Sequence, residues 1–132
     1  MDCADYSANT PNRCYFCKSE LFRRLKEIAA KENIPLVLDG NNADDAGDYR
    51  PGRRAAKESG VASPFMDLGF TKANIRAMSR LLGLPTAERP AQACLASRLA
   101  YGVKIDAETL SKVERAAKSQ DANLFRQRPC LR

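Results

Sequence analysis

The apolar run IPLVLDG, residues 34–40, constrains the fold more than any other feature, because it is the clearest strand pattern in the chain. Its length and its bounding Pro35 and Gly40 are typical of a strand buried in a parallel sheet. A helical pattern precedes it and a long polar loop follows it. That order of elements is typical of an open α/β sheet. Since one strand does not make a sheet, the sequence predicts part of a larger α/β domain.

Four segments have apolar residues at helical spacing. Expected caps define their ends: Ser19 and Thr71 and Asp106 as N-caps, and Gly60 as the residue after a helix C-terminus. Residues 86–102 have no period and are expected to form a loop with one turn, and residues 123–128 could begin a strand. The predicted helices cover residues 18–33, 53–60, 71–82 and 106–120.

The chain has 132 residues, 44% of them hydrophobic, which is enough for one domain and part of a second. No apolar run approaches the length of a membrane span, and the first residues lack the basic and apolar blocks of a signal peptide. We therefore expect a cytoplasmic protein without a membrane partner. In that compartment the five cysteines are thiols or metal ligands rather than disulfides.

The formal net charge of +6 favours an anionic partner, either a phosphorylated small molecule or nucleic acid. Histidine is absent, which excludes histidine triads and histidine-ligated zinc within this chain. Any chemistry must come from cysteine, carboxylates, lysine, arginine and the backbone.

The stretch RCYFCK places Cys14 and Cys17 in a Cys-x-x-Cys pair, which can bind a metal or cluster or act as a redox pair. A structural zinc site needs four ligands, and there is no second such pair. Cys14, Cys17 and Cys94 could instead hold three irons of a [4Fe–4S] cluster and leave the fourth iron open. The alternative is a chance pair and an ordinary buried thiol.

The stretch LDGNNADDAGDYRPGRR, residues 38–54, combines carboxylates, a Gly-Asn-Asn turn and three arginines. Gly40 and Asn41 would let backbone amides approach a phosphate closely. The carboxylates could hold Mg²⁺, and the arginines could grip phosphate. The alternative is a solvated loop whose aspartates cap helices.

The stretch ACLASR places Ser97 and Arg98 three and four residues after Cys94. In a helical turn, Arg98 would lie on the same side as Cys94 and offer a handle for phosphate. The same residues could equally form a packing turn, with Ala93, Leu95 and Ala96 making the contacts.

Three stretches in order, NRCYFCK, LDGNNADDAGDYRPGRRAAKESGVASPF and RPAQACLASRLAYG, joined by GFTKANIRAMSRLLGLPT, resemble the LarE family of ATP-dependent sulfur transferases. The resemblance covers residues 12–114. This family is part of the PP-loop ATP pyrophosphatase group, with NAD synthase, the synthetase domain of GMP synthase and tRNA thiolases.

The resemblance implies a partial Rossmann-like parallel sheet with flanking helices. Residues 1–100 would be the middle and C-terminal part of a PP-loop domain, and residues 101–132 the start of a truncated C-terminal domain. The family's Ser-Gly-Gly-x-Asp-Ser motif is absent, so we expect a piece of a longer protein, and a homo-oligomer at full length.

The activity implied by the resemblance has two stages. ATP adenylylates a carboxylate of a pyridinium biscarboxylate mononucleotide, and sulfur then displaces AMP to leave a thiocarboxylate. The sulfur comes either from Cys94, left as dehydroalanine, or from a [4Fe–4S] cluster on Cys14, Cys17 and Cys94; the Cys-x-x-Cys pair favours the cluster. The implied ATP, Mg²⁺ and substrate contacts are Asp39, Asn41, Asp44, Asp45, Arg53, Ser97 and Arg98.

Two alternatives remain at this point. The chain could belong to another PP-loop enzyme, such as a tRNA thiolase or a relative of NAD synthase or GMP synthase. It could also be a basic zinc-binding module for nucleic acid. The absence of a second ligand pair makes the zinc module the weaker of these, and nucleic acid is not the expected partner.

Overall fold

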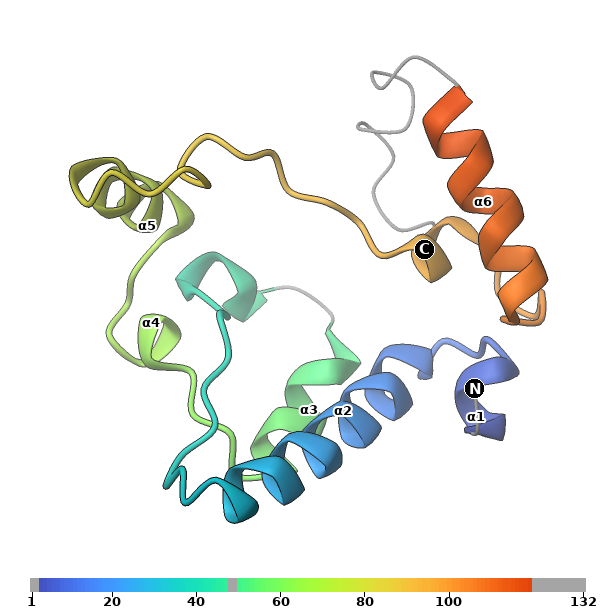
Figure 1. Ribbon diagram of the computed structural model, residues 1–132, viewed down its shortest axis with the longest axis horizontal. Helices are drawn as coiled ribbons and strands as arrows, with labels where there is room; N and C mark the ends of the chain where they lie inside the picture. The colour runs from blue at the N-terminus through green and yellow to red at the C-terminus, as the bar shows by residue number, and fades with distance from the viewer. Residues whose placement is uncertain (1–2, 48–49, 120–132) are drawn as a thin grey trace. The chain divides into compact units, whose positions relative to one another are not determined.

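The computed structural model describes residues 3–47 and 50–119 (Figure 1). The chain divides into two compact units, one formed by Cys14–Pro90 and the other by Met1–Arg13 with Ala91–Arg132. Across the described residues, no helix combines the length and apolar character that a membrane crossing requires. The helices are α1 (Ala4–Ser7), α2 (Arg13–Lys31), α3 (Pro51–Glu58), α4 (Pro64–Asp67), α5 (Lys72–Leu81) and α6 (Ala107–Ser119), with 3₁₀ turns η1 (Ala43–Gly47) and η2 (Leu95–Arg98).

Helix α2 begins at Arg13, earlier than the sequence predicts. Ser19 is therefore not an N-cap, and that prediction is wrong. Its hydroxyl donates to the Tyr15 carbonyl at 2.9 Å, the bond that a serine inside a helix makes with the preceding turn. The consequence is that the Cys-x-x-Cys pair lies on the helix and not in a loop before it.

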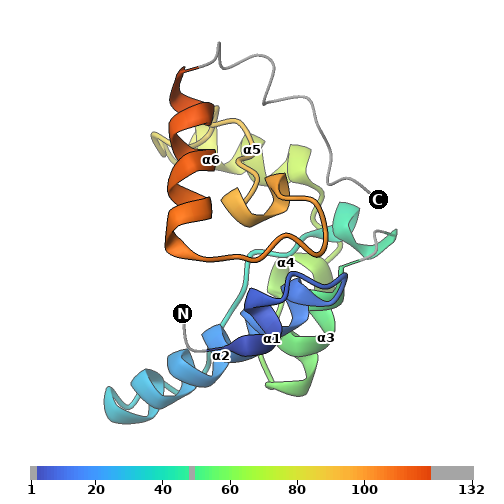
Figure 2. The same ribbon diagram turned by 90° about the vertical axis from the view of Figure 1, so that its right-hand side faces the viewer.

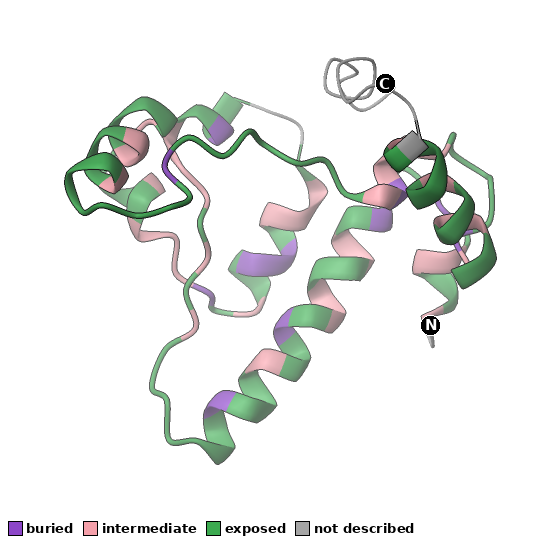
Figure 3. Cartoon of the chain, turned by 45° about the horizontal axis from the view of Figure 1, so that its top comes forward, coloured by how far each residue is buried: buried purple, intermediate pink, exposed green. Residues whose placement is uncertain are grey.

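The core of the 14–90 unit lies between α2 and α3 and consists of Phe22, Ala55, Ala56 and Val61. Buried stretches on both helices alternate with exposed ones (Figure 3). The helices approach closely at Gly52, where an added Cβ would lie 2.9 Å from Lys18 Cγ. Small residues on α3 thus let it pack tightly against the Phe22 face of α2.

The predicted strand over residues 34–40 forms one parallel bridge, between Leu38 and Ala62. Asp39 N donates to the Ala62 carbonyl at 2.9 Å, and Ala62 N donates to the Val37 carbonyl at 3.1 Å. Residues 61–62 had not been predicted as extended. The α/β fold class stays a prediction.

Helix α5 follows its sequence signals closely, and its predicted cap is confirmed. Thr71 and Asn74 form a reciprocal capping box at its start. Gly83, with φ of 65°, takes the left-handed conformation just after its end. The prediction of Gly60 after α3 is confirmed in the same way, with φ of 65°.

In the other unit, α6 begins after Asp106, whose Oδ1 accepts from Thr109 N at 2.8 Å, as predicted. The turn η2 packs against α6 (Figure 2). Ile105, two residues before the start of α6, is fully buried. The prediction of one turn within residues 86–102 is confirmed. The predicted strand over residues 123–128 lies outside the described residues, and the domain boundary at residue 100 stays a prediction.

Candidate functional site

The turn after residue 38 is held by its own side chains. Asp39 Oδ1 accepts from Asn41 N at 3.0 Å, and Asp39 Oδ2 accepts from the Asn41 side-chain amide. Asp39 and Asn41 are both half-buried. These Asx-type hydrogen bonds fix the backbone just after the paired Leu38 segment. In open α/β sheets, ligands bind beyond the carboxyl ends of the strands.

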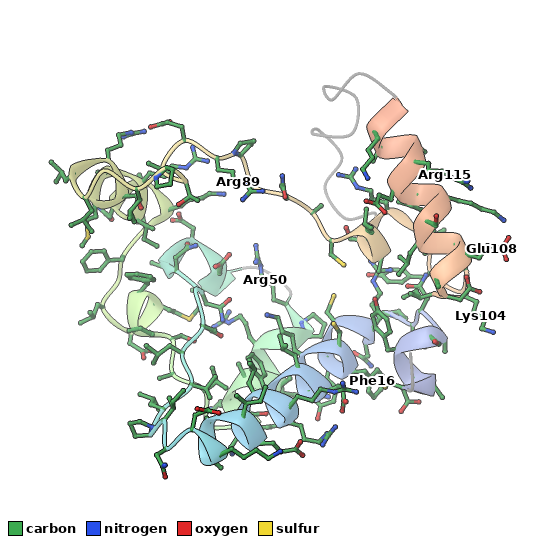
Figure 4. All side chains as sticks on the ribbon, viewed as in Figure 1. Phe16, Arg50, Arg89, Lys104, Glu108 and Arg115 are labelled. Carbon is green, nitrogen blue, oxygen red and sulfur yellow. The ribbon has the colours of Figure 1, made fainter. Side chains whose placement is uncertain are left out.

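Asp45 anchors the 3₁₀ turn η1 from inside. It is buried, accepts from Asn42 N at 3.0 Å and pairs with Arg50 at 2.9 Å. Arg53 donates to the carbonyls of Asp45 and Ala46 at 3.1 and 3.0 Å. Figure 4 shows Arg50 extending beside η1. Asp45 and Arg53 thus shape the loop itself, which is the structural alternative that the sequence left open.

Asp44 points to α5 instead. Its Oδ2 accepts from Lys72 N, the first amide of α5, at 2.9 Å, and the side chain is exposed. A carboxylate at a helix N-terminus stabilises the helix through its unpaired amides and its dipole. The predicted loop residues therefore lie in one unit, and their polar groups form hydrogen bonds with other groups of the chain. They are Asp39, Asn41, Asp44, Asp45 and Arg53.

The Cys-x-x-Cys pair sits at the start of α2. Cys14 and Cys17 are both exposed, and their spacing places them on one side of the helix. Soft, accessible thiols on a fixed backbone are suitable ligands for a metal or cluster. Cys94 belongs to the other unit, so the three cysteines are not assembled within either unit.

Cys94 is the N-cap residue of η2, with an extended backbone and an exposed thiol. Its carbonyl accepts from Ser97 N at 3.0 Å and from the Ser97 hydroxyl at 2.6 Å. Because a 3₁₀ turn has three residues per turn, Ser97 is the residue that returns to Cys94. The expectation that Arg98 would do so assumed an α-helical turn and is not met; Arg98 is half-buried.

The residues that sequence analysis missed are Asn9 and Arg13, a buried polar pair. Asn9 contacts the segment 100–103, which lies more than 90 positions away. Nothing in the local sequence indicates such a contact. Residue type gives no signal either, because arginine and asparagine are mostly exposed in proteins.

No known family model matches the chain. The chain is 36% identical, over 83% of its length, to the pyridinium-3,5-bisthiocarboxylic acid mononucleotide synthase of Lactiplantibacillus plantarum. It is also similar to two uncharacterized proteins, slr1717 of Synechocystis sp. at 51% identity over 85% of the chain, and MJ0830 of Methanocaldococcus jannaschii at 37% over 80%. The chain spans 42%, 40% and 41% of the slr1717, synthase and MJ0830 proteins, about two fifths of their length.

Proposed function

We propose that this chain is part of an ATP-dependent sulfur transferase that converts a carboxylate of a pyridinium mononucleotide into a thiocarboxylate. The observation that carries the proposal is the exposed Cys94 thiol at the head of the η2 turn, whose backbone is fixed by Ser97. It occurs in a chain similar to a protein named as a bisthiocarboxylic acid mononucleotide synthase.

The chemistry begins with activation of the substrate. A substrate carboxylate oxygen attacks the α-phosphorus of ATP, and pyrophosphate leaves to give an acyl adenylate. Sulfur then attacks the acyl carbon, and AMP leaves with the electron pair of its bond. With Cys94 as the nucleophile, a base next removes its α-proton and the Cβ–S bond breaks. The products are a thiocarboxylate and dehydroalanine at residue 94, so atoms and electrons balance.

The second source of sulfur is a [4Fe–4S] cluster, and the proposal includes it because Cys14 and Cys17 otherwise have no role. Three exposed thiols from Cys14, Cys17 and Cys94 fit the donor set that such a cluster takes. When bound, the cluster would carry an additional sulfide as the transferable atom. The task of this chain's own residues is to supply three thiolates and keep Cys94 in place.

The loop of residues 39–45 is proposed to face the ATP phosphates. Its position after the paired Leu38 segment supports this, because the carboxyl ends of strands are the ligand-binding edge of open α/β sheets. Asp44, exposed at the N-terminus of α5, is the proposed neighbour of Mg²⁺. Asp39, Asn41, Asp45 and Arg53 then hold the loop in shape for the nucleotide.

We also propose that residues 34–38 form one strand of a larger parallel sheet. Ile34, Leu36 and Leu38 remain 51%, 52% and 56% exposed, although alternating aliphatic side chains are typical of buried strands. One bridge is too little for a stable sheet. The relatives are about twice as long as this chain, and further strands from such a protein would cover these side chains.

Gly40 provides a test of the nucleotide loop. An added Cβ there meets nothing within 4 Å, and the φ of Gly40 lies outside the left-handed range, so Gly40→Ala leaves the fold intact. The assay uses a protein of the relatives' length that carries this sequence and measures pyrophosphate release. Alanine keeps the backbone amide, but its Cβ would stand where a phosphate approaches the backbone closely. If this weakens one amide–phosphate hydrogen bond, KM for ATP rises about tenfold.

Gly47→Ala is the matched control, because a Cβ there also meets nothing within 4 Å. It should leave KM for ATP unchanged. An unchanged KM in Gly40→Ala would remove the loop from the proposal, and the absence of any pyrophosphate release in the parent protein would remove the ATP step. Cys94→Ala should retain pyrophosphate release and form no thiocarboxylate.

A further inference from the structure

The side chain of Asn9 is wholly buried and fully used. Its Nδ2 donates to the carbonyls of Ala100 and Val103, both at 2.8 Å. The backbone carbonyl of Asn9 accepts from Gly102 N at 3.1 Å. Its backbone φ is 51°, in the left-handed region that asparagine tolerates better than most residues. Asn9 therefore supplies hydrogen-bond partners to the backbone of residues 100–103, which are exposed and belong to no helix or strand.

Arg13 completes the arrangement from the first turn of α2. It is 4% exposed, and its Nη1 donates to Asn9 Oδ1 at 2.6 Å and to the Leu99 carbonyl at 3.5 Å. Its guanidinium lies over the Tyr101 ring, 4.7 Å from the ring centre. We call Asn9 and Arg13 the polar clamp.

The polar clamp acts on the segment that follows the Cys94 turn. Leu99 is the C-cap residue of η2, and Cys94 is its N-cap residue. Residues 99–103 belong to no helix or strand, so hydrogen bonds to the clamp fix their carbonyls. The reciprocal pair between Ser7 and Ile105, at 2.9 and 3.1 Å, fixes the end of the same segment. The η2 turn is thus anchored immediately after its last residue.

We propose that Asn9 and Arg13 are positioning residues for Cys94 and act through the backbone of residues 99–103. This inference rests on the proposed sulfur transfer. Neither residue needs to touch substrate. Positioning matters because a misplacement of about 1 Å at a reacting atom costs on the order of 10²-fold in rate. A buried, charged hydrogen-bond network provides the required rigidity.

The test compares two asparagines with the same backbone conformation. Asn9→Gly retains the left-handed φ and removes the clamp amide. Asn33→Gly is the matched control, because Asn33 has φ of 54°, is exposed, and has no side-chain hydrogen bond to the described residues. Arg13→Lys is a milder second variant, which keeps the charge and leaves the two Asn9 amide bonds in place.

The first readout is hydrogen exchange at the Ser97 and Leu99 amides, which bond within η2 and not to the clamp. We expect exchange there to quicken about tenfold or more in Asn9→Gly, less in Arg13→Lys, and not in Asn33→Gly. Unchanged exchange at Ser97 and Leu99 in Asn9→Gly would overturn the inference, even if Gly102 exchanges faster. This readout needs no substrate, so it stands if the proposed function fails.

The second readout is kinetic, in a protein of the relatives' length. We expect Asn9→Gly to lower kcat for thiocarboxylate formation on the order of 10²-fold, while pyrophosphate release and KM for ATP stay as in the parent. Equal loss of both steps would indicate general unfolding and overturn the positioning role. Wild-type sulfur transfer in Asn9→Gly would overturn it as well. No thiocarboxylate from the parent protein would instead refute the proposed function.

Discussion

The two units of this chain are stabilised by different interactions. The 14–90 unit packs Phe22 against Ala55, Ala56 and Val61, an apolar core between two helices. In the other unit, the buried side chains among the described residues are Asn9, Arg13, Ala96 and Ile105, and hydrogen bonds connect segments far apart in sequence. The segment that follows Cys94 is thus held mainly by buried hydrogen bonds.

The difference has a consequence for tolerance to substitution. Apolar packing is non-directional, and cores of this kind accept side chains of similar volume. Buried hydrogen bonds require both partners in a defined geometry, and the loss of one partner leaves the other unsatisfied. The segment that follows Cys94 should therefore be the less tolerant of conservative changes.

Phe22→Ala should have the largest effect on stability. Phe22 is 2% exposed at the centre of the core, and removal of its ring costs about 3–5 kcal/mol. The 14–90 unit should lose its protection from hydrogen exchange, whereas amides 99–105 retain theirs. Leu21→Ala, at a neighbouring residue that is 42% exposed, is the control. Loss of protection in both units would show that the apolar core and the polar unit are not stabilised separately.

Gly52→Ala should have the next largest effect. Its Cβ would lie 2.9 Å from Lys18 Cγ and 3.4 Å from the Cys14 carbonyl, and the backbone oxygen cannot move without bending α2. Overpacking of this kind costs about 1–3 kcal/mol, measured by denaturant unfolding. Lys18→Ala combined with Gly52→Ala should recover part of the loss. No loss in the single variant would contradict the close helix contact.

Ser7→Ala should cost less, because it removes one neutral hydrogen bond from the polar unit. The Ser7 hydroxyl donates to the Ile105 carbonyl at 3.1 Å, and the net value of such a bond is about 0.5–1.5 kcal/mol. We expect faster exchange at Ile105 and no change in amides of α3. The reverse pattern would contradict the separation of the two units.

The cap formed by Asp106 should have the smallest effect on stability, and its contribution should depend on pH. A hydrogen bond from the Thr109 amide lowers the pKa of Asp106 below its ordinary value of 3.8. Since the folded-state pKa is the lower one, the stabilisation is present above pH 3.8 and is lost as the pH falls through the folded pKa. Asp106→Asn, which caps without a charge, should weaken the acid dependence of the hydrogen-exchange protection of the Thr109 amide. An unaltered acid dependence in that variant would contradict the cap.

The sequence predicted local features of the fold well. Thr71, Asp106 and Gly60 act at helix ends as expected, because capping depends on neighbouring residues only. Helix α2 begins before the predicted Ser19 cap, because a serine can also lie inside a helix and donate its hydroxyl to the preceding turn. The strand at residues 34–40 is represented by one bridge, since strand formation depends on partners elsewhere in the chain.

The candidate site was predicted in part. The loop residues 39–45 do lie together, and their contacts with the chain's own amides match the capping alternative as well as a ligand site. Asn9 could not have been found, because its partners at residues 100 and 103 are distant in sequence. The turn type at Cys94, which makes Ser97 its partner, also required the backbone geometry.

The central claim is that Cys94 supplies or holds the sulfur that enters the product. The most direct measurement is thiocarboxylate formation under anaerobic conditions by Cys94→Ser, beside Cys3→Ser, a half-buried cysteine outside both motifs. Iron, sulfide and the mass of the Cys94 peptide are determined in the same samples. We expect Cys3→Ser to form product with either bound iron and sulfide or a Cys94 peptide lighter by hydrogen sulfide, and Cys94→Ser to form none. Equal product from both variants would contradict the claim.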